Sequence, residues 1–136
     1  ACYRADGSGE LVWKNNKKLY VPSLLLHDGH LYAANDGGIA FCWNAKTGKN
    51  AWTGRLSGNF SASPVLAGGN IYVPNESGTT FVFKATPKTL NIIARNKLGD
   101  ETMASPVICG DRIFLRVASR QRGTRQEMLY AIGNPE

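Results

Sequence analysis

The sequence predicts an all-β fold, a β-propeller segment of about three four-stranded antiparallel blades. The chain has 136 residues, 43% of them hydrophobic and 19% charged, which is the size and composition of one globular domain. Its 15 glycines and 6 prolines interrupt short apolar runs, and none of these runs is long enough to span a membrane. A pattern of strands and turns also recurs three times along the chain, at intervals of 40 and 42 residues.

Each copy of the pattern opens with a predicted hairpin. The first strands begin at three aligned serines, Ser23, Ser63 and Ser105, and an apolar second strand follows each of them. Between the two strands lie residue pairs that supply the positive φ angles of a two-residue turn. These pairs are Asp28-Gly29, Gly68-Gly69 and Gly110-Asp111.

Third and fourth strands follow the hairpin in the first two copies. Third strands are predicted at residues 39–43 and 79–83, each after a turn rich in Asn and Gly. Fourth strands are predicted at residues 51–56 and 90–98. The third copy reaches its third strand at residues 130–133, before any fourth strand.

An additional strand is predicted near the start of the chain. Residues 10–14 resemble the fourth strand around Trp52, because a glycine-containing turn precedes a tryptophan in both. We therefore expect an outer, fourth strand that belongs to a preceding blade. The whole chain, residues 1–136, is predicted to be a single partial propeller with units at about 19–56, 61–98 and 103–133.

Three blades do not close a ring, because propellers contain at least about four. Two possibilities stay open. Either the natural protein is longer, or a second copy of the chain completes the ring by self-association.

Charge and cysteine content narrow the classes of partner. The net charge of +6 permits an acidic partner, but no basic-aromatic signature of a nucleic-acid-binding module is present, so no nucleic acid is expected. Cys2, Cys42 and Cys109 form no CxxC pair, which predicts neither a disulfide framework nor a zinc site. No signal peptide opens the chain, and it begins without Met, so we expect a processed protein or a piece of a longer one.

Residues 42–52 resemble the tryptophan-docking repeat of pyrroloquinoline-quinone (PQQ)-like β-propellers, the quinoprotein alcohol dehydrogenase-like superfamily. Thr47, Gly48, Lys49 and Trp52 fit the pattern Ala-x-Asp-x-x-Thr-Gly-Lys-x-x-Trp, and the departures from it are Cys42 and Asn44. The resemblance implies that Asn44, Thr47, Gly48 and Trp52 are structural docking residues. The indole packs against backbone groups of the next blade, and the turn residue forms local hydrogen bonds. In the second copy, Ile92 stands in the place of the indole.

The resemblance also implies a set of possible functions. Our leading hypothesis is a non-enzymatic scaffold or interaction module of the bacterial periplasm or extracellular space, with a protein partner or further propeller blades. The alternatives are a fragment of a PQQ-dependent dehydrogenase and a glycan-binding propeller, for which Trp43 would be the platform if it were exposed. Family enzymes carry adjacent cysteines and clustered calcium ligands, which this sequence lacks, so neither PQQ nor calcium nor a catalytic residue is expected.

Other polar residues favour structural interpretations. His27 and His30 flank a predicted turn, and we expect solvated turn residues rather than metal ligands. Ser61, Ser63 and Ser105 have no His and acid placed to form a catalytic triad, so we expect them to hydrogen-bond to backbone groups.

Loops at one end of the blades are the predicted ligand- or partner-binding positions. Two of them join successive blades, and the third is an insertion at residues 118–127 that is rich in arginine. Guanidinium groups suit carboxylate and phosphate, so the insertion is either an anion- or acidic-partner-binding loop or a solvated hairpin tip. The candidate residues are Asn59, Phe60, Glu101, Thr102, Arg120, Arg122 and Arg125.

Overall fold

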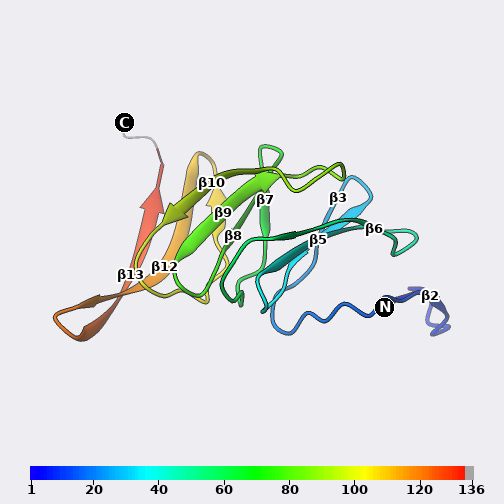
Figure 1. Ribbon diagram of the computed structural model, residues 1–136, viewed down its shortest axis with the longest axis horizontal. Helices are drawn as coiled ribbons and strands as arrows, with labels where there is room; N and C mark the ends of the chain where they lie inside the picture. The colour runs from blue at the N-terminus through cyan, green and yellow to red at the C-terminus, as the bar shows by residue number, and fades with distance from the viewer. Residues whose placement is uncertain (134–136) are drawn as a thin grey trace.

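The computed structural model describes residues 1–133 and builds them from strands, turns and loops (Figure 1). Two four-stranded antiparallel sheets lie next to each other, and a three-stranded sheet follows. The first blade contains β3 (Leu25–His27), β4 (His30–Ala34), β5 (Ile39–Asn44) and β6 (Asn50–Arg55). The second contains β7 (Val65–Ala67), β8 (Asn70–Pro74), β9 (Thr79–Lys84) and β10 (Ile92–Lys97). The third sheet contains β11 (Val107–Cys109), β12 (Arg112–Gln121) and β13 (Thr124–Ile132).

This arrangement confirms the predicted all-β propeller segment. Within residues 1–133 there is no helix that is long and apolar enough to cross a membrane.

The predicted hairpins form because residues with positive φ stand where the chain reverses. Asp28 and Gly29 have φ angles of 45° and 69°, and His27 pairs with His30 across them. The turn between β8 and β9 is held differently, by the buried side chain of Asn75. Its Oδ1 accepts hydrogen bonds from the Thr79 N–H at 2.8 Å and the Ser77 hydroxyl at 2.9 Å. The turn is therefore fixed by a side chain as well as by glycine.

The main core lies between the first two blades. Alternate residues of each strand face the neighbouring sheet, as the period of two of a β-strand requires. The first blade contributes Tyr32, Ala34, Ala40, Cys42 and Trp52, and the second contributes Ile71, Val73, Phe81 and Phe83. Neither blade could shield this apolar face from water alone, so the two blades stabilise each other.

Hydrogen bonds connect successive units through three serines, each of which lies two residues before the first strand of its unit (β3, β7 or β11). The Ser23 N–H donates to Ser63 Oγ at 2.9 Å, and the Ser63 N–H donates to Ser105 Oγ at 2.8 Å. Ser63 and Ser105 thus bond to backbone groups, as expected. Ser61 differs, because its hydroxyl donates to the carboxylate of Glu76 at 2.6 Å.

The start of the chain forms a small hairpin of β1 (Cys2–Tyr3) and β2 (Leu11–Trp13). Cys2 pairs with Trp13, as Cys42 pairs with Trp52 in the first blade. The hairpin therefore reproduces the third and fourth strands of a blade, and β2 takes the position of an outer strand.

The third sheet corrects one prediction. Residues 118–127 do not form a loop, because β12 and β13 remain paired through Ala118–Glu127, Arg120–Arg125 and Gln121–Thr124. Arg122 and Gly123, with φ angles of 50° and 82°, close the ribbon as a two-residue turn. Polar residues fill this segment because both of its faces extend away from the sheet, so it lacks the apolar alternation of a half-buried strand. Figure 1 shows the ribbon reaching well past the other sheets.

Candidate functional site

Two tryptophans dock on neighbouring turns in the same way. Trp52 Nε1 donates to the Thr86 carbonyl oxygen at 2.8 Å, and Trp13 Nε1 donates to the Ala45 carbonyl oxygen at 2.9 Å. Each indole leaves an outer strand and reaches the turn between the third and fourth strands of the next blade. Each ring also gains a partner for its N–H while most of it leaves water.

The turn that receives Trp13 is organised by Asn44. Its Oδ1 accepts hydrogen bonds from the N–H groups of Lys46 and Thr47 at 3.0 Å and from the Thr47 hydroxyl at 3.1 Å. Gly48 has a φ of 68°, and a methyl group on its Cα would overlap the indole of Trp13. Asn44, Thr47 and Gly48 therefore shape the turn on which Trp13 docks. Trp52 docks on the corresponding turn of the second blade, at Thr86.

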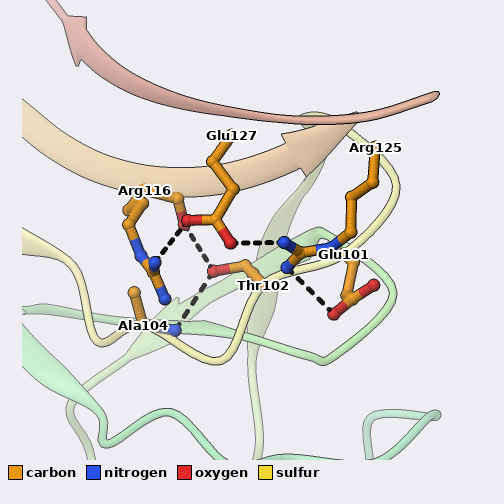
Figure 2. A network of polar contacts seen from close by, with 6 residues as sticks. All are labelled: Glu101, Thr102, Ala104, Arg116, Arg125 and Glu127. Atoms are coloured by element: carbon orange, nitrogen blue, oxygen red, sulfur yellow. Dashed lines mark hydrogen bonds and ion pairs between the residues drawn. The ribbon is translucent and has the colours of Figure 1, made fainter. Parts of the chain in front are cut away.

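The arginine-rich insertion is fixed at its base by a network of charged side chains (Figure 2). The Glu127 carboxylate pairs with both Arg116 and Arg125. Arg125 reaches on to Glu101, with 3.4 Å between Nη2 and Oε1. Because Arg116 and Glu127 belong to the ribbon and Glu101 to the loop that joins two blades, the network ties the ribbon to the sheets.

The electrostatics of this network favour the charged forms of its members. Hydrogen bonds from Arg125, together with the positive charges of Arg116 and Arg125, hold the pKa of the Glu127 carboxyl below its usual range. The pKa of Arg125 is raised by its hydrogen bonds to Glu127 and Glu101. Neutral pH therefore leaves Glu127 and Arg125 ionised.

Backbone pairing reinforces the same attachment. Ala118 and Glu101 form an antiparallel bridge, and the Arg120 N–H donates to Asp100 Oδ2 at 2.8 Å. Buried Thr102 donates its hydroxyl to the Arg116 carbonyl oxygen at 2.7 Å. Thr102 thus acts within the structure and does not present itself to a ligand, in contrast to the prediction.

A second predicted binding residue is also unavailable. Phe60 has an exposed fraction of 0% and packs on Phe81, with 5.8 Å between ring centroids. Its neighbour Asn59 is exposed and uses its carbonyl oxygen to accept the Glu76 N–H at 2.8 Å. The ring of Phe60 fills space between two sheets. The loop from residue 57 to residue 60 therefore places this side chain in the core.

The tip of the ribbon carries two arginines that form no ion pair with any other described residue. Arg120 and Arg125 stand directly opposite each other, so their side chains leave the same face of the ribbon. Arg125 is paired with two carboxylates, whereas the guanidinium groups of Arg120 and Arg122 have no ion pair among residues 1–133. We call residues 118–127 the arm. It brings together the predicted residues Arg120, Arg122, Arg125 and Glu101, and leaves Asn59 in a separate loop.

The spaces around these residues differ in size. A cavity of about 40 Å³ beneath the network has room for little more than water, with Glu101, Thr102, Arg116 and Arg125 in its wall. A larger hollow of about 270 Å³ lies between the second and third sheets at the opposite ends of their strands. Asn70 lines this hollow, and its Oδ1 is buried with no hydrogen-bond partner from the described residues. No sequence pattern pointed to Asn70, because only the packing of two sheets buries its side-chain oxygen.

The residues present do not fit PQQ and calcium. Cys42 is buried between the blades, where burial raises the pKa of its thiol, and Cys2 and Cys109 lie on other elements. Residues 1–133 contain no group of three or more His, Cys, Asp and Glu side chains placed to hold a metal ion. His27 and His30 face each other across their turn, where the Asp28 backbone oxygen lies 2.8 Å from His30 Nδ1.

Trp43, the candidate glycan platform, is buried and stacks on Phe41.

Comparisons with known proteins agree with this architecture. The family described as outer membrane protein assembly factor BamB matches residues 2–90. BamB from Moraxella catarrhalis superimposes with a TM-score of 0.68 at 14% identity, over 92% of this chain and 38% of that protein. Quinohemoprotein alcohol dehydrogenase ADHIIG from Pseudomonas putida HK5 gives a TM-score of 0.58 at 15% identity, over 72% and 21%.

The extent of these matches sets what they show. The chain spans well under half the length of both solved structures. No curated protein matches it. Identities this low show a shared fold, whereas the family match covers more than half of the chain and includes the docked tryptophans and the first blade. The chain therefore belongs to the PQQ-repeat family of the outer membrane protein assembly factor BamB.

Proposed function

We propose that the chain is part of a cofactor-free propeller that acts as a scaffold or protein-interaction module in the bacterial periplasm or extracellular space. Membership of the BamB family supports a role in protein interaction. The arm is the observation that carries the proposal. It extends β12 and β13 beyond the length that the sheet needs, exposes its polar side chains and is held in place by the Glu101–Arg125–Glu127–Arg116 network.

The sheets beside the arm supply the rigid support that such a module needs. Packing and the docked Trp52 fix the first two blades relative to each other, and hydrogen bonds from Ser63 to Ser105 and from Thr102 to Glu76 join the second blade to the segment that leads into the third sheet, so a surface feature on that sheet keeps a constant geometry. Exposed segments that a rigid scaffold positions are the usual places of recognition.

A second partner surface is the free edge of β13. In the first two blades β6 and β10 pair with the third strand, but β13 has no outer neighbour among residues 1–133. Leu129 and Ile132 are exposed along this strand. Further blades of the same protein or a second copy of the chain would cover this edge. Gel filtration with mass detection shows whether two copies associate. A strictly monomeric folded chain would contradict self-association.

The description of the matched family suggests that this scaffold assists the assembly of outer-membrane proteins, and the bacterium that encodes the protein provides the test. Deleting the gene is expected to lower the amount of folded outer-membrane β-barrel protein, measured by heat-modifiable mobility on gels. The full-length gene should restore it. A variant in which the Asn75–Thr79 turn replaces residues 117–128 should restore less, if it accumulates to the same level. Unchanged barrel assembly in the deletion strain contradicts the role.

The enzyme alternative has its own test. A ligand that binds the folded state raises the melting temperature. Because we expect no binding, titration of the purified protein with PQQ and calcium should leave its melting temperature unchanged. A saturable rise together with dye-linked alcohol oxidation would replace the scaffold by a quinoprotein dehydrogenase.

A further inference from the structure

The arm is an addition to the blade rather than part of it. In the second blade Ile71 pairs with Phe83, and the turn from Asn75 to Thr79 connects the two strands. In the third sheet Ile113 pairs with Ile132 in the same way. The register therefore places Val117 and Met128 where Asn75 and Thr79 stand. Everything between Val117 and Met128 extends past the edge at which the second blade turns back.

The arm is held rigidly at its base. Glu127 bonds Arg116 and Arg125, the Arg120 N–H bonds Asp100, and Ala118 pairs with Glu101. These contacts come from both strands of the arm and from the loop beside it. A partner that binds the arm consequently does not have to order it first, which removes part of the entropic cost of association.

The charges on one face of the arm are unbalanced. Like charges directly opposite each other on two strands destabilise the pair, and Arg120 faces Arg125 in this way. The nearby carboxylates of Glu101 and Glu127 are occupied by Arg125 and Arg116. Among residues 1–133, neither Arg120 nor Arg122, at the turn, has an ion-pair partner, so both guanidinium groups can donate hydrogen bonds to an added carboxylate. A carboxylate placed between Arg120 and Arg125 would also relieve the repulsion between these two arginines.

The backbone offers a second mode of contact on the same element. Within residues 1–133, β13 lies at the edge of its sheet, and no strand lies beside its outer edge from Thr124 to Glu127. This part lies beyond the position where β10 ends on β9, at Lys97 and Thr79, so an ordinary outer strand would leave it open. Free strand edges bind extended segments by adding one strand to the sheet.

We infer that the arm is a docking site for an extended acidic protein segment, which pairs with β13 at residues 124–127. Side chains alternate along such a segment, so every second residue faces Arg120 and Arg125. Carboxylates at those positions bind the arginines, while a carboxylate beside Glu127 is disfavoured by repulsion. Arg125 and Glu127 leave the same face of β13 two residues apart, so the segment is acidic at the position beside Arg125 and uncharged at the next position on that face, beside Glu127. This inference deepens the proposed function, because it names the class of partner.

The test uses the purified chain and a short fluorescent peptide with two glutamates at alternate positions, followed on the same face by the uncharged residue that is expected beside Glu127. Anisotropy should report saturable binding that weakens with added salt. Arg120→Glu with Arg122→Glu should weaken it at least about tenfold, since two exposed ion pairs become repulsive. Neither side chain makes an ion pair in residues 1–133, so the double variant should melt at the wild-type temperature.

A matched control has the same change of net charge far from the arm. Lys14→Glu with Lys18→Glu alters exposed residues near the N-terminal hairpin, at the opposite end of the molecule (Figure 1), and should change the affinity by less than about twofold. Amide signals of residues 124–127 should shift on binding, since strand addition engages that backbone. The peptide with glutamine in place of glutamate should not bind.

Several outcomes overturn the inference. Wild-type affinity in the Arg120→Glu, Arg122→Glu variant excludes the arm, and an equal loss in the lysine variant shows unspecific attraction. Competition by inorganic phosphate or anionic phosphatidylglycerol vesicles at lower concentrations than the peptide would mark a phosphate or lipid site instead. Peptide binding is measured without cells. Its failure alone therefore leaves the assembly role standing, and failure of the deletion experiment alone leaves the peptide site standing.

Discussion

The junction of the first two blades and the arm are built on opposite principles. At the junction, side chains such as Trp52, Phe60 and Phe83 have exposed fractions of 7% or less. Along the arm, every residue from Arg120 to Glu127 is exposed, and ion pairs and backbone hydrogen bonds fix it. Apolar burial stabilises the junction strongly, whereas ion pairs in water contribute little each. The repeat therefore provides stability, and the segment that departs from the repeat provides a polar surface.

One position shows the change directly. The strand register places Ala34, Pro74 and Arg116 at equivalent points of β4, β8 and β12. Ala34 and Pro74 are buried, but the Arg116 side chain is 59% exposed and pairs with Glu127. The third sheet therefore presents a charged residue where the first two sheets present an apolar contact.

The largest expected effect is at the junction. Trp52→Ala removes an indole that packs against Tyr32 and Phe83 and bonds Thr86, so it should lower the free energy of unfolding by about 3–5 kcal/mol. The matched change on the arm, Arg122→Ala, should stay within about 0.5 kcal/mol. Urea unfolding measures both. A loss below about 1 kcal/mol for Trp52→Ala would show that the indole does not hold the sheets together.

A pair of glycines separates strain from packing at the N-terminal junction. Gly29 and Gly48 have φ angles of 69° and 68°, so alanine at either position costs about 1 kcal/mol of backbone strain. A methyl group at Gly29 meets nothing, whereas at Gly48 it meets the Trp13 ring. Gly48→Ala should therefore also shift the Trp13 indole N–H resonance towards its solvent-exposed position. The same shift in Gly29→Ala would contradict the docking.

The smallest expected effect is the acid response of the arm. The pKa of Glu127 lies below its ordinary value of 4.5, so its ion pairs stabilise the arm at neutral pH and are lost as the pH falls through the lowered pKa. The protection of the amides of residues 125–127, measured against the intrinsic exchange rate at each pH, should fall in that range, while the protection of β5 and β9 stays constant. Glu127→Gln should show the lower protection already at pH 7. A parallel loss of protection in all three strands would indicate global unfolding instead.

Local signals made the blades predictable. Glycine-containing pairs marked the hairpins and the serines marked the repeat. The motif ending at Trp52 lies within a short stretch of sequence, so its resemblance to a known repeat could be seen, and that resemblance implied docking. The strands of the arm were missed, since exposed polar ribbons lack the apolar alternation from which strands are predicted. The contacts of Glu101 with Arg125 and of Phe60 with Phe81 join distant residues, so they depend on how strands align and sheets stack.

The serines that open the inner strands have a consequence for how this architecture can vary. Ser63 uses its amide towards Ser105 of the following unit and its hydroxyl towards Ser23 of the preceding one. If a unit were duplicated or removed at these boundaries, the units brought next to each other would form the same hydrogen bond between their serines. Blade number can therefore change by whole units during evolution without any new contact having to arise at the centre of the ring.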